Sequence, residues 1–372
     1  MSMLKDPRLD TLAKTLVHYS VAMQQGETVL ISASIKAKPL ILALLKTIRQ
    51  LKGNPIVELS DDEINREILL SSTDKSMDRN FRWLDRKLDD IDCIIHIRAS
   101  ESDYTSQDVS SDIKMAIARK MNPLTKKRLA KKWVLLNYPT EGGAHKARLS
   151  YEKYFDFIVD VSSVDYSKMN IAFQPLKELM EKTDQVHIIA KNTDLSFSIK
   201  GMNAIPCAGN FNIPDGEIFT APVKNSVNGT ITYNTPSPER GTVFTNVSLT
   251  FKDGKIIEAT ADQENELLQK IFDTDEGSRY VGEFAIGVNP LIDKPMGDIL
   301  FDEKIAGSIH FTPGRCYEDA PNGNDSAIHW DLVQIQTPEY GGGEIYFDGR
   351  LIRKDGRFVL PELFGLNPEN LR

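Results

Sequence analysis

Glycine is distributed very unevenly along this chain. Only four of the 23 glycines precede residue 184, and the other nineteen follow it. Because glycine is suited to tight turns and unfavourable inside helices, the two parts of the chain must be built differently. The chain has 372 residues, which is enough for two domains at about 100 to 200 residues each. We therefore expect an N-terminal domain over residues 1–183 and a C-terminal domain over residues 184–372.

Helical and strand-like patterns alternate in the first part. Apolar residues recur at helical spacing from Leu9 to Val21, and a second helix is expected from Pro39 to Leu51. Short apolar runs lie between the helical stretches. Thr28–Ile31 has the composition of a buried strand, and Ile56–Leu59, Cys93–Ile97 and Trp133–Leu136 are strand-like as well. This alternation predicts an α/β domain with a mostly parallel sheet covered by helices.

Short strands separated by turn residues follow in the second part. After a helix expected over Ser167–Lys182, the runs Val186–Ala190 and Leu195–Ile199 flank a turn signal and indicate a hairpin. Further strand-like runs are Thr230–Tyr233, Val247–Lys252, Lys255–Ala259 and Gly343–Phe347. The second domain is therefore expected to be β-rich, of the α+β class.

The composition excludes several classes of protein. Apolar residues make up 41% of the chain, charged residues 26%, and the mean hydropathy is -0.31. These values exclude a disordered, collagen-like or membrane-embedded chain. The net charge of -8 provides no basic field, so we expect neither a nucleic-acid partner nor a membrane partner.

Cysteine usage and the N-terminus bear on the compartment. The three cysteines, Cys93, Cys207 and Cys316, have no CxxC spacing, so neither a disulfide framework nor a zinc ribbon is supported. The N-terminus lacks the apolar core of a signal peptide, and no run of 18 apolar residues occurs. We expect a cytoplasmic protein.

Two of the six histidines lie close together among acidic residues of the second part. If residues 327–333 form a strand, His329 and Asp331 share one face while their apolar neighbours take the other. His310 stands in a similar run, Ser308–Thr312. Imidazole and carboxylate groups on rigid strands suit a divalent metal. The alternative is a histidine that is merely hydrogen-bonded to a neighbouring acid.

Two glutamates, each preceded by glycine, strengthen the metal hypothesis. Glu217 and Glu283 each stand beside an apolar, strand-like run. A charge in such a position is costly unless it is paired or bound to a metal. The alternative for either glutamate is an exposed position on an edge strand.

Four ordered blocks of sequence resemble a known family. The blocks are Asn210–Pro222, Gly282–Asn289, Gly307–His310 and Ser326–Asp331. They resemble the signature blocks of the thermophilic-type metallo-aminopeptidases, the aminopeptidase T family. Similarity extends to Asp6-Pro7-Arg8 and Gly26–Ile31 near the N-terminus and to Tyr138-Pro139-Thr140, so it covers nearly the whole chain.

The resemblance implies an exopeptidase with two divalent metal ions in the C-terminal domain. The residues that fall on the family's metal ligands are Glu217, Glu283, His310, His329 and Asp331, with Glu303 as a further ligand. Tyr317 falls on a tyrosine near the metals. The resemblance also implies peptide substrates with a free N-terminus and a homodimer.

This ligand set has chemical consequences. Carboxylates and imidazoles without cysteine suit zinc, cobalt, manganese or magnesium. Six ligands exceed the three that one open catalytic zinc needs, so we expect two ions, with Asp331 as a bridge and a shared water as the nucleophile. Glu217 or Glu283 would move the proton, and Tyr317 would support the oxyanion or else orient a ligand.

Two other functions remain open from the sequence. A metal hydrolase of the same architecture could act on another amide or an ester, because the ligands dictate water activation and not the substrate. Alternatively, the protein could be a binding module in which the metal is structural.

Overall fold

The computed structural model describes residues 6–102 and 104–372. The chain forms two compact units, each assembled from two separate stretches. Unit 1 comprises the residues up to Ser163 together with Gly209–Pro214, and unit 2 comprises Val164–Ala208 together with Asp215–Arg372. A domain boundary at residues 183–184 stays a prediction.

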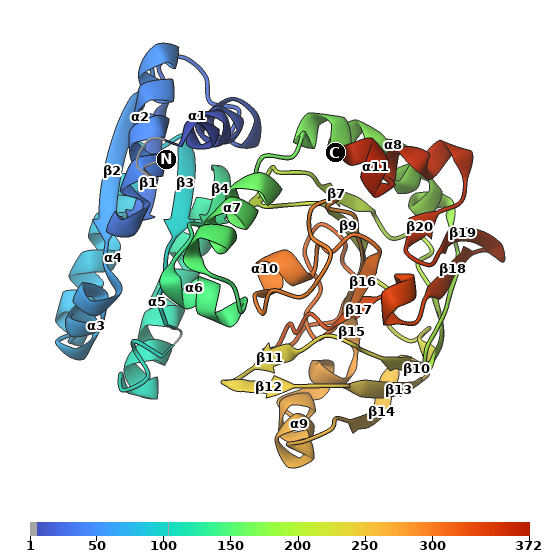
Figure 1. The fold of residues 1–372 in the computed structure, drawn as a ribbon. Helices are drawn as coiled ribbons and strands as arrows, with labels where there is room; N and C mark the ends of the chain where they lie inside the picture. Colours follow the sequence, from blue (N-terminus) through green and yellow to red (C-terminus); the bar gives the residue numbers. More distant parts are fainter. Residues whose placement is uncertain (1–5, 103) are drawn as a thin grey trace. The chain divides into compact units, whose positions relative to one another are not determined.

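Unit 1 contains a five-stranded parallel sheet, of which the strands labelled β1 to β4 are drawn in blue to teal in Figure 1. Its strands, in spatial order, are β2 (Asn54–Ser60), β1 (Thr28–Ser34), β3 (Cys93–Arg98), β4 (Lys132–Asn137) and β8 (Asn212–Ile213). Val29, Leu30 and Ile31 of β1 are at most 5% exposed. A central strand buried on both faces accounts for this continuous apolar run.

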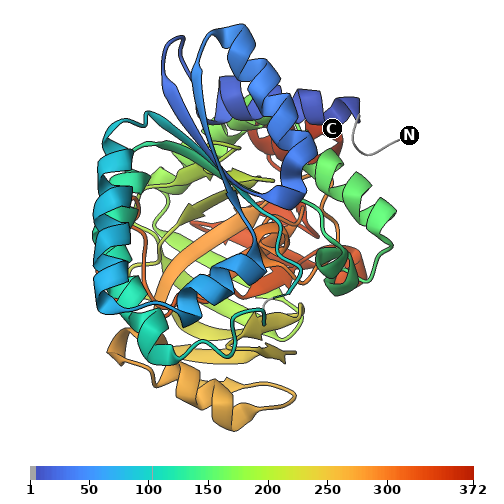
Figure 2. The same ribbon diagram turned by 90° about the vertical axis from the view of Figure 1, so that its left-hand side faces the viewer.

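Helices cover both faces of the parallel sheet. The helices of unit 1 are α1 (Pro7–Lys14), η2 (Thr15–Ser20), η3 (Ile35–Ala37), α2 (Lys38–Leu51), α3 (Asp62–Leu70), α4 (Asp74–Asp89), α5 (Ser111–Leu129), α6 (Glu141–Lys146) and α7 (Tyr151–Val161). Of these, α3 has no buried residue. Leu88 of α4 and Leu124 of α5 pack with Leu30 and Ile94 of the sheet. Helix α2 lies on the opposite side of the strands (Figure 2).

The limits of α2 follow from its sequence. Pro39 stands in its first turn, where the missing N–H costs nothing, and Lys52 ends the helix in a left-handed conformation with a φ of 58°. Leu40, Leu44 and Ile48 recur at helical spacing and are fully buried. The helix expected from Pro39 to Leu51 is thereby confirmed.

Unit 2 is built mainly from antiparallel sheets. The larger has eight strands in the order β14 (Lys255–Thr260), β13 (Ser248–Lys252), β10 (Asn228–Thr232), β6 (Thr193–Ser198), β5 (Gln185–Ala190), β18 (Gly343–Phe347), β19 (Arg350–Lys354) and β20 (Arg357–Phe358). A five-stranded sheet has the order β17 (Val333–Ile335), β16 (Ser308–Pro313), β15 (Val281–Gly287), β9 (Glu217–Thr220) and β7 (Ile205–Cys207), and β11 (Ser237–Glu239) pairs with β12 (Thr242–Phe244).

Aromatic side chains join the two larger sheets of unit 2 face to face. Phe197 of β6 contacts Phe284 of β15 and Phe311 of β16, with ring centroids 5.0 Å apart in both pairs. Phe251 of β13 contacts Phe311 as well. Because side chains alternate along a strand, the neighbours of Phe284 and Phe311 point to the opposite face of the five-stranded sheet.

The remaining elements of unit 2 are short apart from one helix. They are α8 (Tyr166–Lys182), α9 (Asn265–Phe272), η4 (Glu276–Arg279), α10 (Ile299–Asp302), η5 (Pro338–Tyr340), η6 (Pro361–Leu366) and α11 (Pro368–Leu371). Asn192 has a φ of 54° between β5 and β6, as a tight hairpin turn requires. The predicted fold class, a parallel helix-covered part followed by a β-rich part, is confirmed. Within the described ranges, no helix has the length and apolar character that crossing a membrane requires.

Candidate metal centre

The register of β9, β15 and β16 brings three of the predicted ligands to one face of the five-stranded sheet. Ala285 in β15 pairs with Phe219 on one side and with His310 on the other. Glu283 precedes Ala285 by two residues, and Glu217 precedes Phe219 by two. Since side chains two residues apart share a face, both glutamates and His310 project from the side opposite the aromatic core.

The glycine before each glutamate has a structural cause. Gly216 has a φ of +133°, and a Cβ there would lie 3.0 Å from Cβ of Asn289. A Cβ on Gly282 would lie 2.4 Å from the carbonyl oxygen of Arg315. Neighbouring backbone therefore crosses close to both strands, which only glycine permits. The glycine before each glutamate in the sequence is therefore explained by the close approach of this backbone.

Glu303 and Lys304 reach the same face from the end of α10. The carboxylate of Asp302 accepts hydrogen bonds from the backbone N–H groups of Met296 (2.6 Å) and Gly297 (3.1 Å), which fixes the preceding turn. Burial raises the pKa of Asp302 to about 7, against the effect of these two donors. The Lys304 ammonium then forms an ion pair with Glu303 and lies 3.4 Å from Oε1 of Glu217.

His329 is oriented by a backbone carbonyl. Its Nδ1–H donates to the carbonyl oxygen of Arg315 at 2.7 Å. This bond leaves Nε2 facing two carboxylates, 3.2 Å from Oε2 of Glu283 and 3.4 Å from Oδ1 of Asp331. A histidine held in this way has the tautomer and direction of a metal ligand.

The segment that carries His329 differs from the expected strand. Regular pairing begins only at Val333 in β17, and before it His329 forms a single bridge with Gly314. The expectation of a continuous strand over residues 327–333 is wrong. The chain is nevertheless extended there, so His329 and Asp331 are only part-buried while Ile328, Trp330 and Leu332 are at most 5% exposed.

Asp331 is held by a hydroxyl group. The Thr312 hydroxyl donates to Oδ1 of Asp331 at 2.7 Å. Although burial raises the pKa of Asp331, the neighbouring His329 outweighs burial and holds that pKa well below its ordinary value. Asp331 is therefore an anion at neutral pH.

The predicted ligands form two groups of donors that share one histidine. Glu283, His310 and Asp331 offer ligand atoms within 4.8 Å of one another, and so do Glu217, Glu303 and His310. We call them group A and group B, respectively. The two ring nitrogens of His310 face different groups, since Nε2 lies 3.3 Å from Oε1 of Glu283 and Nδ1 lies 3.5 Å from Oε2 of Glu217.

A third group of donors is chemically weaker. Cys207, Asp215 and Glu217 also offer atoms within 4.8 Å of one another. Burial raises the pKa of the Cys207 thiol well above its ordinary value. A protonated thiol is a poor metal ligand, so this group adds little to groups A and B.

Three buried polar atoms of the cluster have no hydrogen bond within the described part of the chain. They are Oε2 of Glu217, Nδ1 of His310 and Nε2 of His329. Buried polar atoms are normally hydrogen-bonded. These three lie 3.2 to 3.5 Å from oppositely charged groups without forming hydrogen bonds, an arrangement that suits a bound ligand. Carboxylate and imidazole donors with unused lone pairs fit a divalent cation of hard to borderline character.

Burial and mutual repulsion act on the glutamates of group B. Burial raises the pKa of Glu217 to about 8 and also raises that of Glu303, against the attraction of Lys304. Burial acts in the same direction on Glu283, but the imidazole of His310 outweighs it and lowers the pKa. Group B is therefore short of positive charge even with one ammonium beside it.

The histidines respond in the opposite sense. Burial alone lowers a histidine pKa, but Glu217 and Glu283 raise the pKa of His310 to about 10. In the same way, Asp331 and Glu283 raise the pKa of His329 to about 11. Four carboxylates thus surround two imidazoles and one ammonium.

Tyr317 borders the cluster through its ring. The ring lies 4.8 Å from the ring of His329 and 5.4 Å from that of Phe219, measured between centroids. The residue is 44% exposed. Its part in oxyanion support stays a prediction, as do the ligand roles of the other six predicted residues.

Sequence reasoning missed Lys304, Thr312 and the carbonyl group of Arg315. Lys304 could have been noticed, because it is a charge between Glu303 and the apolar Ile305, and buried charges need partners. No sequence signal indicates the Arg315 carbonyl, since its place depends on the loop that passes Gly282.

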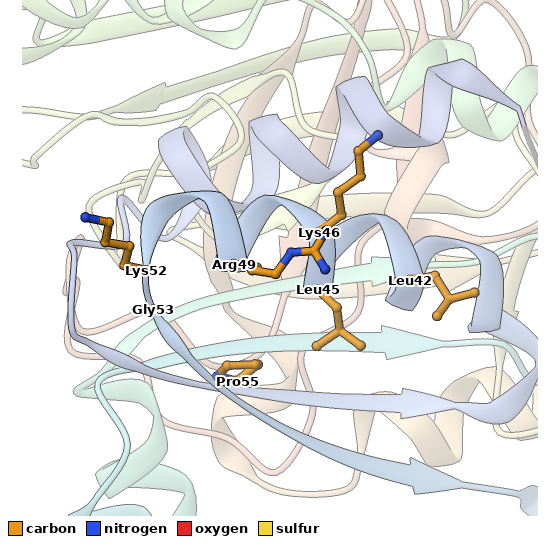
Figure 3. A pocket seen from close by; sticks show the side chains of 7 residues that line it. All are labelled: Leu42, Leu45, Lys46, Arg49, Lys52, Gly53 and Pro55. Atoms are coloured by element: carbon orange, nitrogen blue, oxygen red, sulfur yellow. The ribbon is translucent and has the colours of Figure 1, made fainter.

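The pocket in Figure 3 lies elsewhere, in unit 1. It has a volume of about 650 Å³ between α2 and β2. The residues that line it are Leu42, Leu45, Lys46, Arg49, Lys52, Gly53 and Pro55. It contains no carboxylate or imidazole and therefore has none of the donors that a metal centre requires.

The chain is similar to known peptidases along nearly its whole length. A family model described as thermophilic metalloprotease (M29) matches residues 5–358. Aminopeptidase 2 of Geobacillus stearothermophilus is 24% identical over 404 aligned positions that cover 95% of each protein. Aminopeptidase T of Thermus thermophilus is 32% identical over 170 positions, which cover 41% of each.

The fold is shared with a solved structure. Wild-type AmpT from Thermus thermophilus matches with a TM-score of 0.78 over 95% of this chain and 99% of that one, at 20% sequence identity. The family model spans unit 1 and most of unit 2, including all the predicted ligands. The chain therefore belongs to the thermophilic metalloprotease (M29) family, whose members hydrolyse peptide bonds with the help of a metal.

Proposed function

We propose that this protein is a metal-dependent aminopeptidase, which releases the N-terminal residue of a peptide. The observation that carries the proposal is the convergence of four carboxylates and two imidazoles on one face of the five-stranded sheet. Several relatives are named aminopeptidases, among them those of Geobacillus stearothermophilus and Bacillus subtilis. Family membership and the chemistry of the cluster point the same way.

We propose that the cluster binds two divalent ions. Group A, together with His329, would hold one ion, and group B would hold the other. Asp331 would bridge the two ions; since His310 is the member that both groups share, Asp331 would have to turn toward group B. Zinc, cobalt, manganese and magnesium all suit the donors. When bound, such a pair lowers the pKa of a shared water toward about 7 and polarises the scissile carbonyl.

Among the chain's own groups, Glu217 is the better candidate for the proton shuttle. Glu283 is tied to two imidazoles, with carboxylate-to-nitrogen distances of 3.3 Å to His310 and 3.2 Å to His329. Oε2 of Glu217 has no hydrogen bond within the described residues. This oxygen lies 3.5 Å from Nδ1 of His310. A carboxylate oxygen without a hydrogen bond can take a proton from water and pass it to the leaving amine.

The free α-amino group of the substrate supplies the selectivity. Its reference pKa is about 7.7 to 8.0, so near neutrality both its protonated and its unprotonated form are populated. The first can pair with a carboxylate such as Glu303, and the second can coordinate a metal. N-acetylation abolishes both interactions.

The proposal is tested with a panel of aminoacyl p-nitroanilides, assayed after each metal in turn is added back to the chelated protein. We expect turnover that requires metal. Full turnover by protein whose metal content is shown to be zero would contradict the proposal. Equal hydrolysis of N-blocked amides or of esters would instead indicate a less selective hydrolase.

Two further properties belong to this proposal. We propose a homodimer, since an enclosing interface between subunits would keep folded proteins away from the metals. A monomer in sedimentation at micromolar concentration would contradict it. We also propose that the protein works in the reducing cytoplasm, where the free thiols of Cys93, Cys207 and Cys316 persist.

A further inference from the structure

Lys304 is fully buried at the centre of group B. Its side chain is 0% exposed, while those of its partners Glu217 and Glu303 are 8% and 14% exposed. The backbone of Lys304 is fixed on both sides, since its N–H donates to the Phe301 carbonyl at 3.1 Å and its carbonyl accepts from Asn289 at 2.9 Å. The backbone that carries the ammonium is therefore fixed close to these two carboxylates.

The ammonium occupies the donors that a second ion needs. Group B consists of Glu217, Glu303 and His310, and Lys304 contacts the first two. An ammonium has three donor hydrogens and no acceptor, so it cannot act as a ligand beside a metal. It is a cation that competes for the same oxygens.

Among the described residues, the cations beside group A are of another kind, because they are imidazoles that become ligands once they lose a proton. The partners of Glu283 and Asp331 there are the imidazoles of His310 and His329 together with the Thr312 hydroxyl. An imidazole nitrogen can itself bind a divalent ion. The two groups therefore differ in kind, because a metal gains ligands at group A and must displace a cation at group B.

Removing Lys304 from its carboxylates has a physical cost. A buried ammonium is stable only while it is paired, and a divalent ion at the same oxygens would repel it strongly at short range. The side chain must swing away, or give up its charge, before group B can bind an ion. That cost is subtracted from the binding free energy at group B alone.

We propose that Lys304 makes the two metal positions unequal, so that one divalent ion binds tightly at group A while a second binds weakly at group B. This inference rests on the proposed function, because it assumes that the cluster binds metal. In this proposal, the Lys304 ammonium occupies the position that the second ion would take. Half of the second ion's charge is then present before any second ion arrives.

The test is a titration of the chelated protein with cobalt(II) alone, followed by calorimetry and by the visible absorption of bound cobalt. The variant is Lys304→Met, which keeps the length of the side chain and removes its charge. The control is Lys294→Met, because Lys294 is an exposed lysine on the same unit. We expect wild type and control to bind one ion at least tenfold more tightly than a second. In Lys304→Met the second ion should bind at least tenfold more tightly than in wild type.

Each result decides the inference. Two ions of equal affinity in wild type, or an unchanged second affinity in folded Lys304→Met, would overturn it. If Lys304→Met does not fold, the wild-type titration decides alone: unequal steps support the inference and equal steps overturn it. Unequal steps without any turnover of aminoacyl p-nitroanilides would leave the inference standing while the proposed function fails, so the two are separable.

Discussion

The ring of Tyr317 packs edge-on against the imidazole of His329, with their centroids 4.8 Å apart and their planes inclined at 65°. A second contact also holds His329 in place, namely the hydrogen bond that its Nδ1–H donates to the Arg315 carbonyl. Together these contacts fix the direction of Nε2 toward Glu283 and Asp331. Tyr317 thus has two separable groups, a ring that positions His329 and a hydroxyl available for the substrate.

Replacing Tyr317 by phenylalanine separates the two roles. The ring contact survives in Tyr317→Phe, so metal affinity should match that of wild type. If the hydroxyl supports the oxyanion, kcat should fall about 100-fold, as it does when one such donor is lost. Tyr317→Ala should lose the ring as well and weaken metal binding. A kcat for Tyr317→Phe within threefold of wild type would show that the hydroxyl plays no part.

Asp331→Asn should cost far more activity than stability. The amide oxygen can still accept the hydrogen bond from the Thr312 hydroxyl, which is 2.7 Å long in the wild-type protein, so the variant should fold. The lost charge removes a proposed bridging ligand, and kcat should fall at least 100-fold. A kcat within about threefold of wild type would mean that less than about 1 kcal/mol of barrier is involved, which would contradict the bridging role.

Asp275 forms hydrogen bonds with Ser326 and Ala327, at the start of the segment that carries His329. Its carboxylate accepts hydrogen bonds from the hydroxyl of Ser326 at 2.8 Å and from the backbone N–H of Ala327 at 2.7 Å. It also caps η4 through the N–H of Ser278. We expect Asp275→Ala to lower the free energy of unfolding by about 1 to 2 kcal/mol at pH 7, and Ser326→Ala to lower it less.

The effect of Asp275→Ala should depend on pH in a defined direction. Burial raises the pKa of Asp275, but the N–H of Ala327 and the hydroxyl of Ser326 outweigh it and lower the pKa below the ordinary value of 3.8. A lowered pKa gives stability that is complete above the unfolded-state value and is lost as the pH falls through the folded-state value. The difference between wild type and variant in urea unfolding should be constant from pH 8 to 5 and shrink toward pH 3. A difference that stays the same at pH 3 would contradict this assignment.

Much of the fold could be predicted from local sequence. The run Val29, Leu30 and Ile31 is apolar because β1 is buried on both faces, and the Pro39 to Leu51 pattern forms α2 with both of its ends as expected. The return of Asn212–Ile213 to unit 1 as the strand β8 could not be predicted. A strand of two residues has no periodicity, and its place is decided by contacts distant in sequence.

The residues of the candidate site could be predicted from the sequence, but their arrangement in space could not. The Gly-Glu pairs and the two histidines carry local signals, since a charge in an apolar strand needs a partner. The division into groups A and B depends on the register of β9, β15 and β16 and on where α10 delivers Glu303. Lys304 has only a weak local signal, its place between Glu303 and the apolar Ile305, and its full burial follows from where α10 ends.

The central claim is that the protein recognises the free α-amino group of its substrate at a metal centre. The most direct measurement compares Leu-p-nitroanilide with its N-acetyl form, at one pH and one cobalt(II) concentration, with chelated protein as the blank. We predict turnover of the free-amine substrate only in the presence of metal, and a kcat/KM at least 1000-fold lower for the acetylated substrate. Comparable kcat/KM values for the two substrates, or undiminished turnover by the metal-free protein, would contradict the account.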